Sequence, residues 1–309
     1  VWDGVVRLQA TVTVNGGTLI ILPGTRVLVD MRDPVNANLQ SGNNNNRRVQ
    51  FNSGVIRVGE GGAVTPVVLE TRKSFATTNR WSGFADNGAA NNDRVWSMQN
   101  TVLRDAIRPV DLENIDMNSN GRSAVFEDVV VEDCDEGMFL ECPSVMDRVT
   151  VRRLGGNRQA LRVGLQIACP TELAYSHITT FGTTSGLQLN TAAEETHVVL
   201  SGLDISATQS GLDLQGGVSS DVLDSRFTGI TSTFAGHGAM TVGPADDVVV
   251  RRTTFEDATF AIALLNTGLL SLDVRDSTFR RLSRALTVRQ ADADTSIEVH
   301  GNVFDTVSS

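Results

Sequence analysis

A twelve-residue stretch from Asp116 to Glu127, DMNSNGRSAVFE, matches the pattern of a calcium-binding loop. Asp116, Asn118 and Asn120 place side-chain oxygens at the first, third and fifth positions, and a glycine at the sixth permits a sharp reversal. The backbone carbonyl of Arg122 and the carboxylate of Glu127 would complete the shell. The spacing predicts a weak, structural calcium site typical of extracellular proteins. The alternative is an Asx turn without an ion, because Asn, Asp and Gly form such turns unaided.

The charge of the chain argues against two classes of partner. The 36 acidic residues outnumber the 26 basic ones, giving a net charge of −10. A nucleic-acid binder needs a cationic footprint, so we expect no nucleic acid among the partners. No apolar run approaches the roughly 18 residues that a membrane-spanning helix requires, and we expect no membrane span.

The chain repeats itself with a period near 25 residues. The stretches VVVRRTTFEDATFAIAL (248–264) and LDVRDSTFRRLSRALTV (272–288) share one apolar frame, in which Val250 aligns with Val274 and Phe255 with Phe279. The first of these positions can be followed along the chain at intervals of 22 to 28 residues through Met98, Phe126, Val151, Tyr175, Leu200, Val222, Val250, Val274 and Val299. Internal repeats of this length indicate a solenoid or a related repeat architecture.

The composition of each repeat decides which solenoid is expected. Short alternating apolar runs are separated by Gly, Asn, Asp, Ser and Thr, and no helical stripe is sustained. We therefore predict an all-β parallel β-solenoid with roughly twelve coils of three short strands. We expect a single domain over residues 1–309, with irregular coils over 1–97, an Asn-rich surface loop at 36–54, and regular coils over 98–309.

Two of the three cysteines lie about one repeat apart. Cys142 and Cys169 each precede a proline and are separated by 27 residues. Equivalent turns of stacked strands lie about 4.8 Å apart, a separation that a disulfide can span. We expect a Cys142–Cys169 bridge with Cys134 buried and free. Stacked reduced thiols and a Cys134–Cys142 bridge are the alternatives. A bridge would indicate an oxidising compartment.

Several segments resemble a known family. TLIILPGTRVLV (18–29), GGAVTPVVLET (61–71) followed by RWSGF (80–84), and later coils such as VRDSTF (274–279) are similar to the secreted and cell-surface right-handed parallel β-helix proteins of the pectin-lyase-like class. The resemblance covers nearly the whole chain. It implies a right-handed coil and an extracellular or cell-surface location. It implies no single activity, because this fold hosts lyases, hydrolases, adhesins and structural proteins.

Enzymes of that class carry carboxylates on one outer face, which stacked coils would show as an acidic column. The outward column between paired apolar residues reads Asp111, Phe139, Arg162, Gln188, Asp213, Thr241, Ala263 and Thr287. The paired carboxylates of glycoside hydrolysis therefore do not line up in this column. In another column Arg251 and Arg275 are candidates for the base of a lyase, although nearby acids can neutralise them as surface pairs.

The histidines give no metal-binding pattern. His237 lies between two glycines, as in the tripeptide of polygalacturonases, but the other motifs of that family do not accompany it, and we interpret it as a turn. The remaining histidines have no Cys or His partner at metal-ligand spacing, namely His177, His197 and His300. No catalytic residue is assigned, and enzyme activity is left open.

These patterns favour a non-enzymatic, extracellular structural or adhesive protein. Val299 and Phe304 begin a coil that the final residues do not finish. Exposed strand ends invite pairing, so we expect either head-to-tail assembly into a filament or surface layer, or a domain continued by further sequence. The expected partners are other copies of the chain, other surface components and a polysaccharide. The alternatives are a polysaccharide lyase or glycoside hydrolase acting on an acidic polysaccharide, and a segment of a phage or virus fibre.

Overall fold

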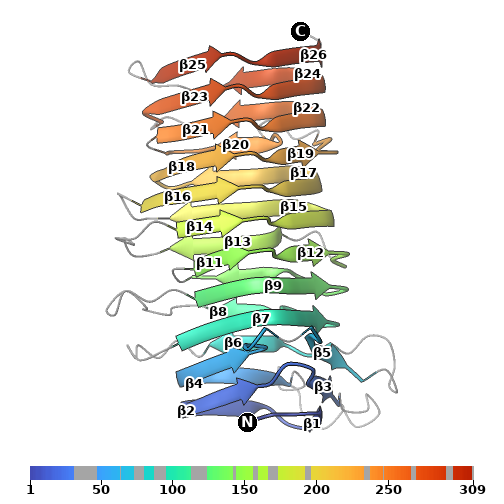
Figure 1. Cartoon of the computed structure of the whole chain (residues 1–309). Coiled ribbons are helices and arrows are strands. Elements are labelled where there is room, and N and C mark those ends of the chain that lie inside the picture. The colour runs from blue at the N-terminus through green and yellow to red at the C-terminus, as the bar shows by residue number, and fades with distance from the viewer. Residues whose placement is uncertain are drawn as a thin grey trace, which may run out of the picture. The chain divides into compact units, whose positions relative to one another are not determined.

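The computed structural model describes residues 1–30, 47–62, 64–72, 80–86, 95–112, 124–141, 144–155, 159–165, 173–191, 196–232, 237–245, 247–265, 269–289 and 295–307. These residues form 26 strands and no helix, and the strands pair in parallel with their equivalents one coil along (Figure 1). The predicted fold class, an all-β parallel β-solenoid, is confirmed. The described residues also contain no helix of the length and apolar character that a membrane span requires.

The solenoid has about nine turns, not the roughly twelve expected from a period of 25 residues. The early coils explain the difference, because they are longer than the later ones. Leu19 pairs with Ile56, and Ile56 pairs with Trp96, so these two coils span 37 and 40 residues. Of the loop predicted at 36–54, residues 36–46 lie outside the described part of the chain. The remainder is mostly strand, because Val49 and Phe51 alternate inward from residue 48 onward.

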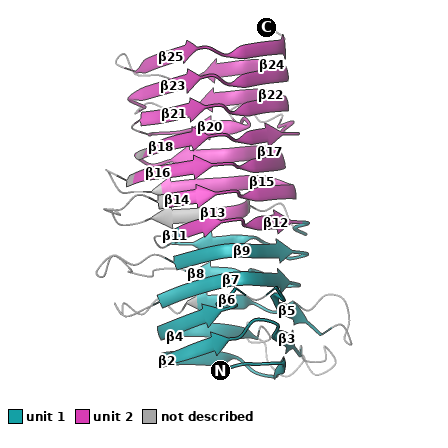
Figure 2. Ribbon diagram, in the orientation of Figure 1, with its two compact units in different colours: residues 1–144, 153–156 teal, residues 145–152, 157–309 magenta. Residues whose placement is uncertain are grey.

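The chain forms two compact units (Figure 2). Unit 1 comprises residues 1–144 and 153–156, and unit 2 comprises residues 145–152 and 157–309. The prediction of a single domain over 1–309 stays a prediction. The strands of unit 1 are β1 (Val5–Leu8), β2 (Val12–Ile21), β3 (Arg26–Val29), β4 (Arg48–Val58), β5 (Val67–Thr71), β6 (Gly83–Asp86), β7 (Val95–Arg104), β8 (Val110–Leu112), β9 (Ala124–Glu132) and β10 (Met138–Leu140).

Strand β11 (Ser144–Asp147) lies at the division of the chain, with all but its first residue in unit 2. The other strands of unit 2 are β12 (Thr150–Arg152), β13 (Gln159–Leu165), β14 (Leu173–Ser176), β15 (Thr179–Thr191), β16 (Thr196–Ser201), β17 (Asp204–Gln215), β18 (Val218–Leu223), β19 (Arg226–Thr228), β20 (Met240–Val242), β21 (Asp247–Arg251), β22 (Thr254–Leu264), β23 (Ser271–Arg275), β24 (Thr278–Val288), β25 (Ser296–His300) and β26 (Val303–Val307).

The predicted apolar column forms the core of unit 2. Val222 pairs with Val250, Val250 with Val274, and Val274 with Val299. Val222, Val250 and Val274 are fully or almost fully buried, because alternate residues of each strand point inward. Stacking equivalent side chains removes their apolar surface from water, and this burial is the main force that holds the coil together.

One member of that column was wrongly assigned. Tyr175 pairs with Met146, whereas Val151 pairs with Thr180. A second inward column follows the first at a distance of five residues, as Phe255 follows Val250. Val151 lies five residues after Met146 and belongs to this second column. Both positions are apolar and buried, so residue type alone did not separate them.

The second column ends in a stack of phenylalanines. The rings of Phe227, Phe255, Phe279 and Phe304 follow one another with centroid separations of 5.3, 5.2 and 5.0 Å and nearly parallel planes. Phe227 and Phe255 are fully buried, whereas Phe304 is 54% exposed. Each ring fills the space beside its neighbour, so the stack fixes the register of β19, β22, β24 and β26.

A single left-handed residue makes the corner between the two columns. Asp224, Arg252 and Asp276 have φ angles of 50°, 49° and 51°, and each lies two residues after its inward valine. This conformation is uncommon for residues other than glycine, so it is held here by the stacked strands on either side. Because corners stack, Arg252 donates to Asp224 one coil away at 2.6 and 2.8 Å.

Unit 1 has a core of a different composition. The rings of Phe51, Trp81, Phe84, Trp96 and Phe126 cluster, with centroid separations between 5.4 and 6.3 Å. All five side chains are essentially buried, and the indole Nε1 of Trp81 donates to the carbonyl of Arg104 at 2.8 Å. Large aromatic rings fill the interior of these coils, where smaller aliphatic residues would leave cavities.

The outer surface of unit 1 carries charges that alternate from coil to coil. Glu70 contacts Arg26 and, at 3.9 Å, Arg104. Glu132 contacts Arg104 and, at 2.8 Å, Arg153. Glu132 is only 2% exposed, so the two arginines compensate a carboxylate that has lost most of its water. Stacked coils bring these charges together although they are far apart in the sequence.

Candidate functional site

A pocket of about 250 Å³ opens over β15 and β17 in unit 2. The register places Gln188 beside Asp213 and Ser185 beside Ser210, so two neighbouring coils supply its floor. The remaining lining residues include Gln209 of β17 and the segment after β19. The described lining residues are Ser185, Leu187, Gln188, Gln209, Ser210, Asp213, Ser232 and His237. Apart from Leu187, every lining side chain can donate or accept a hydrogen bond.

Two polar atoms of this pocket lack the hydrogen bonds that burial demands. Ser210 is 6% exposed and Asp213 is 9% exposed. Among the described residues, the hydroxyl of Ser210 and Oδ1 of Asp213 are buried with no hydrogen-bond partner. A buried polar group without a partner costs about 1–3 kcal/mol. A ligand that supplies hydrogen bonds to both atoms would recover this cost on binding.

The carboxyl group of Asp213 has an unusual environment. Burial raises the pKa of Asp213 above its ordinary value, because the ionised form is poorly solvated. Hydrogen bonds from Gln215 and Gln188 and the charge of His237 offset part of this rise in pKa. Gln215 Nε2 donates to Oδ2 at 3.0 Å, and Oδ1 is buried without a hydrogen-bond partner among the described residues. The arrangement is suited to a hydrogen bond with a hydroxyl-bearing ligand.

The chain has been compared with known proteins at three levels. No family model, no curated protein and no solved structure matches it. The fold therefore rests on the strand pairing, and the function has to be argued from the geometry of the described residues.

The outward column predicted from the sequence is confirmed where the structure describes it. Phe139 pairs with Asp111 in unit 1. In unit 2 the paired residues follow one another as Gln188, Asp213, Thr241, Ala263 and Thr287. The sequence thus placed Asp213 correctly. It gave no sign of the pocket, because Ser232 and His237 come from the connection between β19 and β20, whose path no repeat pattern specifies.

His237 was interpreted as part of a turn and not as a site residue. It lies outside the strands, its side chain lines the pocket, and its charge lowers the pKa of Asp213. The signal that could have identified it is its distance along the chain from β20. His237 lies three residues before Met240, and Met240 pairs with Leu212 beside Asp213.

The predicted calcium loop falls almost entirely outside the described residues. Asp116, Asn118, Asn120 and Arg122 lie there, and calcium at this loop stays a prediction. Glu127 is described. It lies half-buried on β9, where it pairs in register with Gln99 of β7. Glu127 is thus part of an extended strand.

The cysteine predictions are tested in part. Cys142 and Cys169 lie outside the described residues, so their bridge stays a prediction. Cys134 is buried and free, as expected, and does not form the alternative bridge to Cys142. Burial raises the pKa of the Cys134 thiol to about 12, so the thiol remains protonated at neutral pH. Cys134 is therefore a core residue and not a reactive nucleophile.

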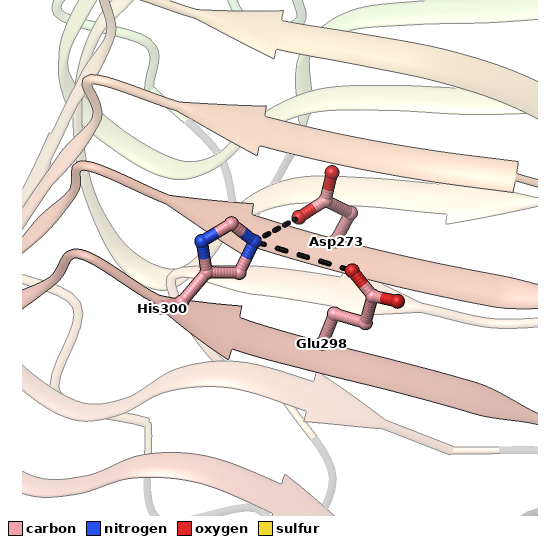
Figure 3. Close-up of side chains that lie close together, drawn as sticks. All are labelled: Asp273, Glu298 and His300. Atoms are coloured by element: carbon pink, nitrogen blue, oxygen red, sulfur yellow. Dashed lines mark ion pairs between the residues drawn. The ribbon is translucent and has the colours of Figure 1, made fainter.

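Asp273, Glu298 and His300 converge on the outer side of β23 and β25 (Figure 3). His300 Nε2 lies 3.7 Å from Asp273 and 4.0 Å from Glu298, and the three ligand atoms lie within 4.8 Å of one another. The expectation that His300 lacks partners was too narrow, because it considered only Cys and His. The register pairs Asp273 with Glu298 and Arg275 with His300, which brings carboxylates to this histidine.

Arginines already occupy these carboxylates. Arg275 donates to Asp273 at 2.6 Å and to Glu298 at 3.4 Å, and Arg251 lies 3.8 Å from Asp273. Two guanidinium groups repel a metal cation and compete for the same oxygens. We interpret the cluster as a surface charge network. Arg251 and Arg275, the candidates for a lyase base, are thus neutralised by ion pairs, as the nearby acids had suggested.

Proposed function

We propose that the chain is a non-enzymatic, adhesive β-solenoid that holds a polysaccharide through the pocket over β15 and β17. The observation that carries this proposal is the pair of buried, unpartnered polar atoms, Ser210 Oγ and Asp213 Oδ1. A folded protein tolerates such atoms where a ligand completes their hydrogen bonds. The resemblance to extracellular β-helix proteins of the pectin-lyase-like class supports an extracellular or cell-surface location.

The chemistry of the pocket favours a hydroxyl-rich ligand. Amides of Gln188 and Gln209 and hydroxyls of Ser185 and Ser232 can each donate and accept. Sugar hydroxyls can also both donate and accept hydrogen bonds, so they match these lining groups. The volume of about 250 Å³ is below the roughly 300–1,000 Å³ of pockets that enclose drug-sized ligands. One sugar ring of a longer chain would occupy it.

A binding role fits the pocket better than hydrolysis does. Asp213 is the one carboxylate among the described residues that line this pocket, whereas most glycoside hydrolases need two carboxylates across the bond that they cleave. Its neighbours in the outward column are Gln188 and Thr241. Neither side chain carries a carboxylate, so neither can act as the second acid or base of a hydrolase. Tight binding without turnover is the expected behaviour.

An enzyme is the second candidate, and one observation favours it. A carboxyl group with a raised pKa beside His237 is an arrangement found where acids and bases perform catalysis. A polysaccharide lyase or hydrolase would release new unsaturated or reducing ends. Incubation of acidic and neutral polysaccharides with the protein, followed by measurement of both kinds of ends, separates the candidates.

The binding proposal is tested with a panel of immobilised oligosaccharides. We expect saturable binding to at least one sugar class, weakened roughly tenfold by Asp213→Asn or Ser210→Ala. Asp204→Asn is the matched control, because Asp204 lies exposed on the same strand outside the pocket. No binding to any sugar, or equal losses from Asp204→Asn and Asp213→Asn, would contradict the proposal.

Self-association is a further part of the proposal. Val299, Val303 and Phe304 of β25 and β26 are 45%, 58% and 54% exposed. Apolar strand residues of this kind can be covered by another copy of the chain or by further sequence, and head-to-tail assembly into a filament or layer is the version that we propose. A trimeric fibre segment remains the alternative assembly.

Calcium at Asp116–Glu127 would act as a structural clip. Its test is a rise in the melting temperature of the protein with millimolar calcium that a chelator reverses.

A further inference from the structure

A second pocket, of about 440 Å³, lies over β22 and β24 in unit 2. The two strands pair in register, with Phe260 beside Arg284 and Ala263 beside Thr287. The pocket is lined by Thr259, Phe260, Ala263, Ser283, Arg284, Thr287, Val288 and Arg289. It shares no lining residue with the pocket over β15 and β17. The two sites can therefore be tested independently.

The arginines of this pocket differ from the others on β24. Arg280 pairs with Asp305 at 3.5 Å, and Arg281 pairs with Asp257 at 2.6 Å. Among the described residues, Arg284 and Arg289 have no carboxylate within 4.0 Å. Acidic residues outnumber basic ones in this chain, so two guanidinium groups in one pocket that have no carboxylate partner among the described residues are unexpected. Their charge favours an anion.

The other lining residues indicate which kind of molecule would carry the anionic group. Phe260, Ala263 and Val288 form an apolar wall, and the guanidinium carbon of Arg284 lies 5.9 Å from the ring centre of Phe260. A flat ring can pack against this apolar wall, and a guanidinium beside such a ring adds cation–π attraction. The hydroxyl oxygen of Thr287 is buried without a hydrogen-bond partner in the described part of the chain. It can donate to an oxygen of the ligand.

We propose that this pocket binds a small organic anion in which a carboxylate is attached to a flat ring. Arg284 and Arg289 hold the carboxylate, and charged hydrogen bonds of this kind are stronger than neutral ones. Phe260 and Val288 contact the ring, and Thr287 donates the remaining hydrogen bond. Neither the ring nor the charge alone satisfies the whole lining, so binding requires both in one molecule.

The test is calorimetric titration of the full chain with three probes. Naphthalene-2-carboxylate carries ring and charge, naphthalene-2-methanol carries the ring alone, and acetate carries the charge alone. We expect saturable binding of the first probe, at least tenfold weaker binding of the other two, and weakening by added salt. The aromatic carboxylate should bind with one site per chain.

Variants assign the binding to this pocket. Arg284→Gln and Arg289→Gln should each raise the dissociation constant roughly tenfold. Arg280→Gln is the matched control, because Arg280 lies on the same strand and pairs with Asp305. Circular dichroism verifies that each variant is folded. The proposal is overturned if the aromatic carboxylate does not bind, which would mean that acids of the chain satisfy the arginines, or if Arg280→Gln weakens binding as much as Arg284→Gln.

Discussion

Single aspartates in this molecule behave according to where the coil places them. Asp213 faces a pocket and is buried, and burial raises its pKa. Asp224 occupies an exposed corner, where the hydrogen bonds from Arg252 lower its pKa. The two residues have the same chemistry and opposite shifts of pKa. Position in the coil, and not residue type, therefore decides which carboxylate is available for a ligand.

The raised pKa of Asp213 predicts a stability effect. Because the folded-state pKa is raised, the folded protein favours the protonated form of Asp213. The contribution of this group to stability is therefore largest at low pH and is lost as the pH rises through the folded-state pKa. Asp213→Asn should therefore increase the free energy of unfolding at pH 7 by on the order of 1 kcal/mol and have little effect at pH 3. Thermal melting followed by circular dichroism at both pH values measures the difference.

Asp224→Asn provides a control of opposite sign. The lowered pKa of Asp224 contributes stability above the ordinary aspartate range near pH 4, and this contribution is lost as the pH falls through the folded-state pKa. The Asp224→Asn variant should melt at or slightly below the wild-type temperature at pH 7. A higher melting temperature for Asp224→Asn than for Asp213→Asn at pH 7 would contradict these assignments.

At the scale of elements, the turns constrain the coil as strongly as the strands do. Gly59 follows β4 with a φ of 71°, and a Cβ atom there would lie 1.9 Å from the carbonyl oxygen of Gln99 in the next coil. Gly62 has a similar φ of 67° with nothing within 4 Å of a Cβ atom. Comparing the two glycines therefore separates the cost of a left-handed backbone from the cost of close contact with the next coil.

We expect Gly62→Ala to cost about 1 kcal/mol, which reflects the left-handed backbone alone. Gly59→Ala should cost roughly 3 kcal/mol or more, since the neighbouring coil must also move. Chemical denaturation followed by circular dichroism gives both values. Similar losses in the two variants would show that the coils around Gly59 are not packed as closely as the structure places them.

The stacked phenylalanines give a second expectation at this scale. Phe255 lies between two rings and is fully buried, so Phe255→Ala should cost about 3–5 kcal/mol. Phe304 has one stacked neighbour and is 54% exposed, so Phe304→Ala should cost about 1 kcal/mol or less. Equal costs would mean that Phe304 is covered in solution, for example by a second copy of the chain.

The sequence predicted the columns of the coil but not their connections. Val250, Val274 and Val299 were aligned correctly because each strand repeats the same inward position. Val151 was placed one column away, because the two inward columns lie five residues apart and hold similar side chains. The pocket was missed for a related reason. His237 reaches Asp213 from a segment between strands, where no period constrains the path of the chain.

For the whole molecule, the pairing of charges and the exposure of apolar residues lead to different expectations. Arginine–carboxylate pairs neutralise much of the described outer surface, as in the network of Arg251, Arg275 and Asp273. The exposed apolar residues of β25 and β26 have no such compensation. Because its charges are paired, we expect this part of the surface to attract ions only weakly. The exposed apolar residues of β25 and β26 instead favour contact with another strand.

Self-association through β25 and β26 is expected to depend on concentration. Sedimentation velocity should detect oligomers of the wild-type chain that Phe304→Asp reduces, because a charge at an apolar contact is costly to bury. Arg289→Gln is a control that removes a charge from a residue outside β25 and β26. A wild-type chain that stays monomeric at high concentration would contradict the assembly proposal.

The most direct test of the central claim follows the side-chain amides of the pocket by nuclear magnetic resonance. During titration with a sugar selected from the panel, we expect the resonances of Gln188, Gln209 and Gln215 to shift together. Those of Gln50 and Gln99 in unit 1 should not move. Unchanged resonances of Gln188 and Gln209 at saturation would contradict the claim that this pocket is the binding site.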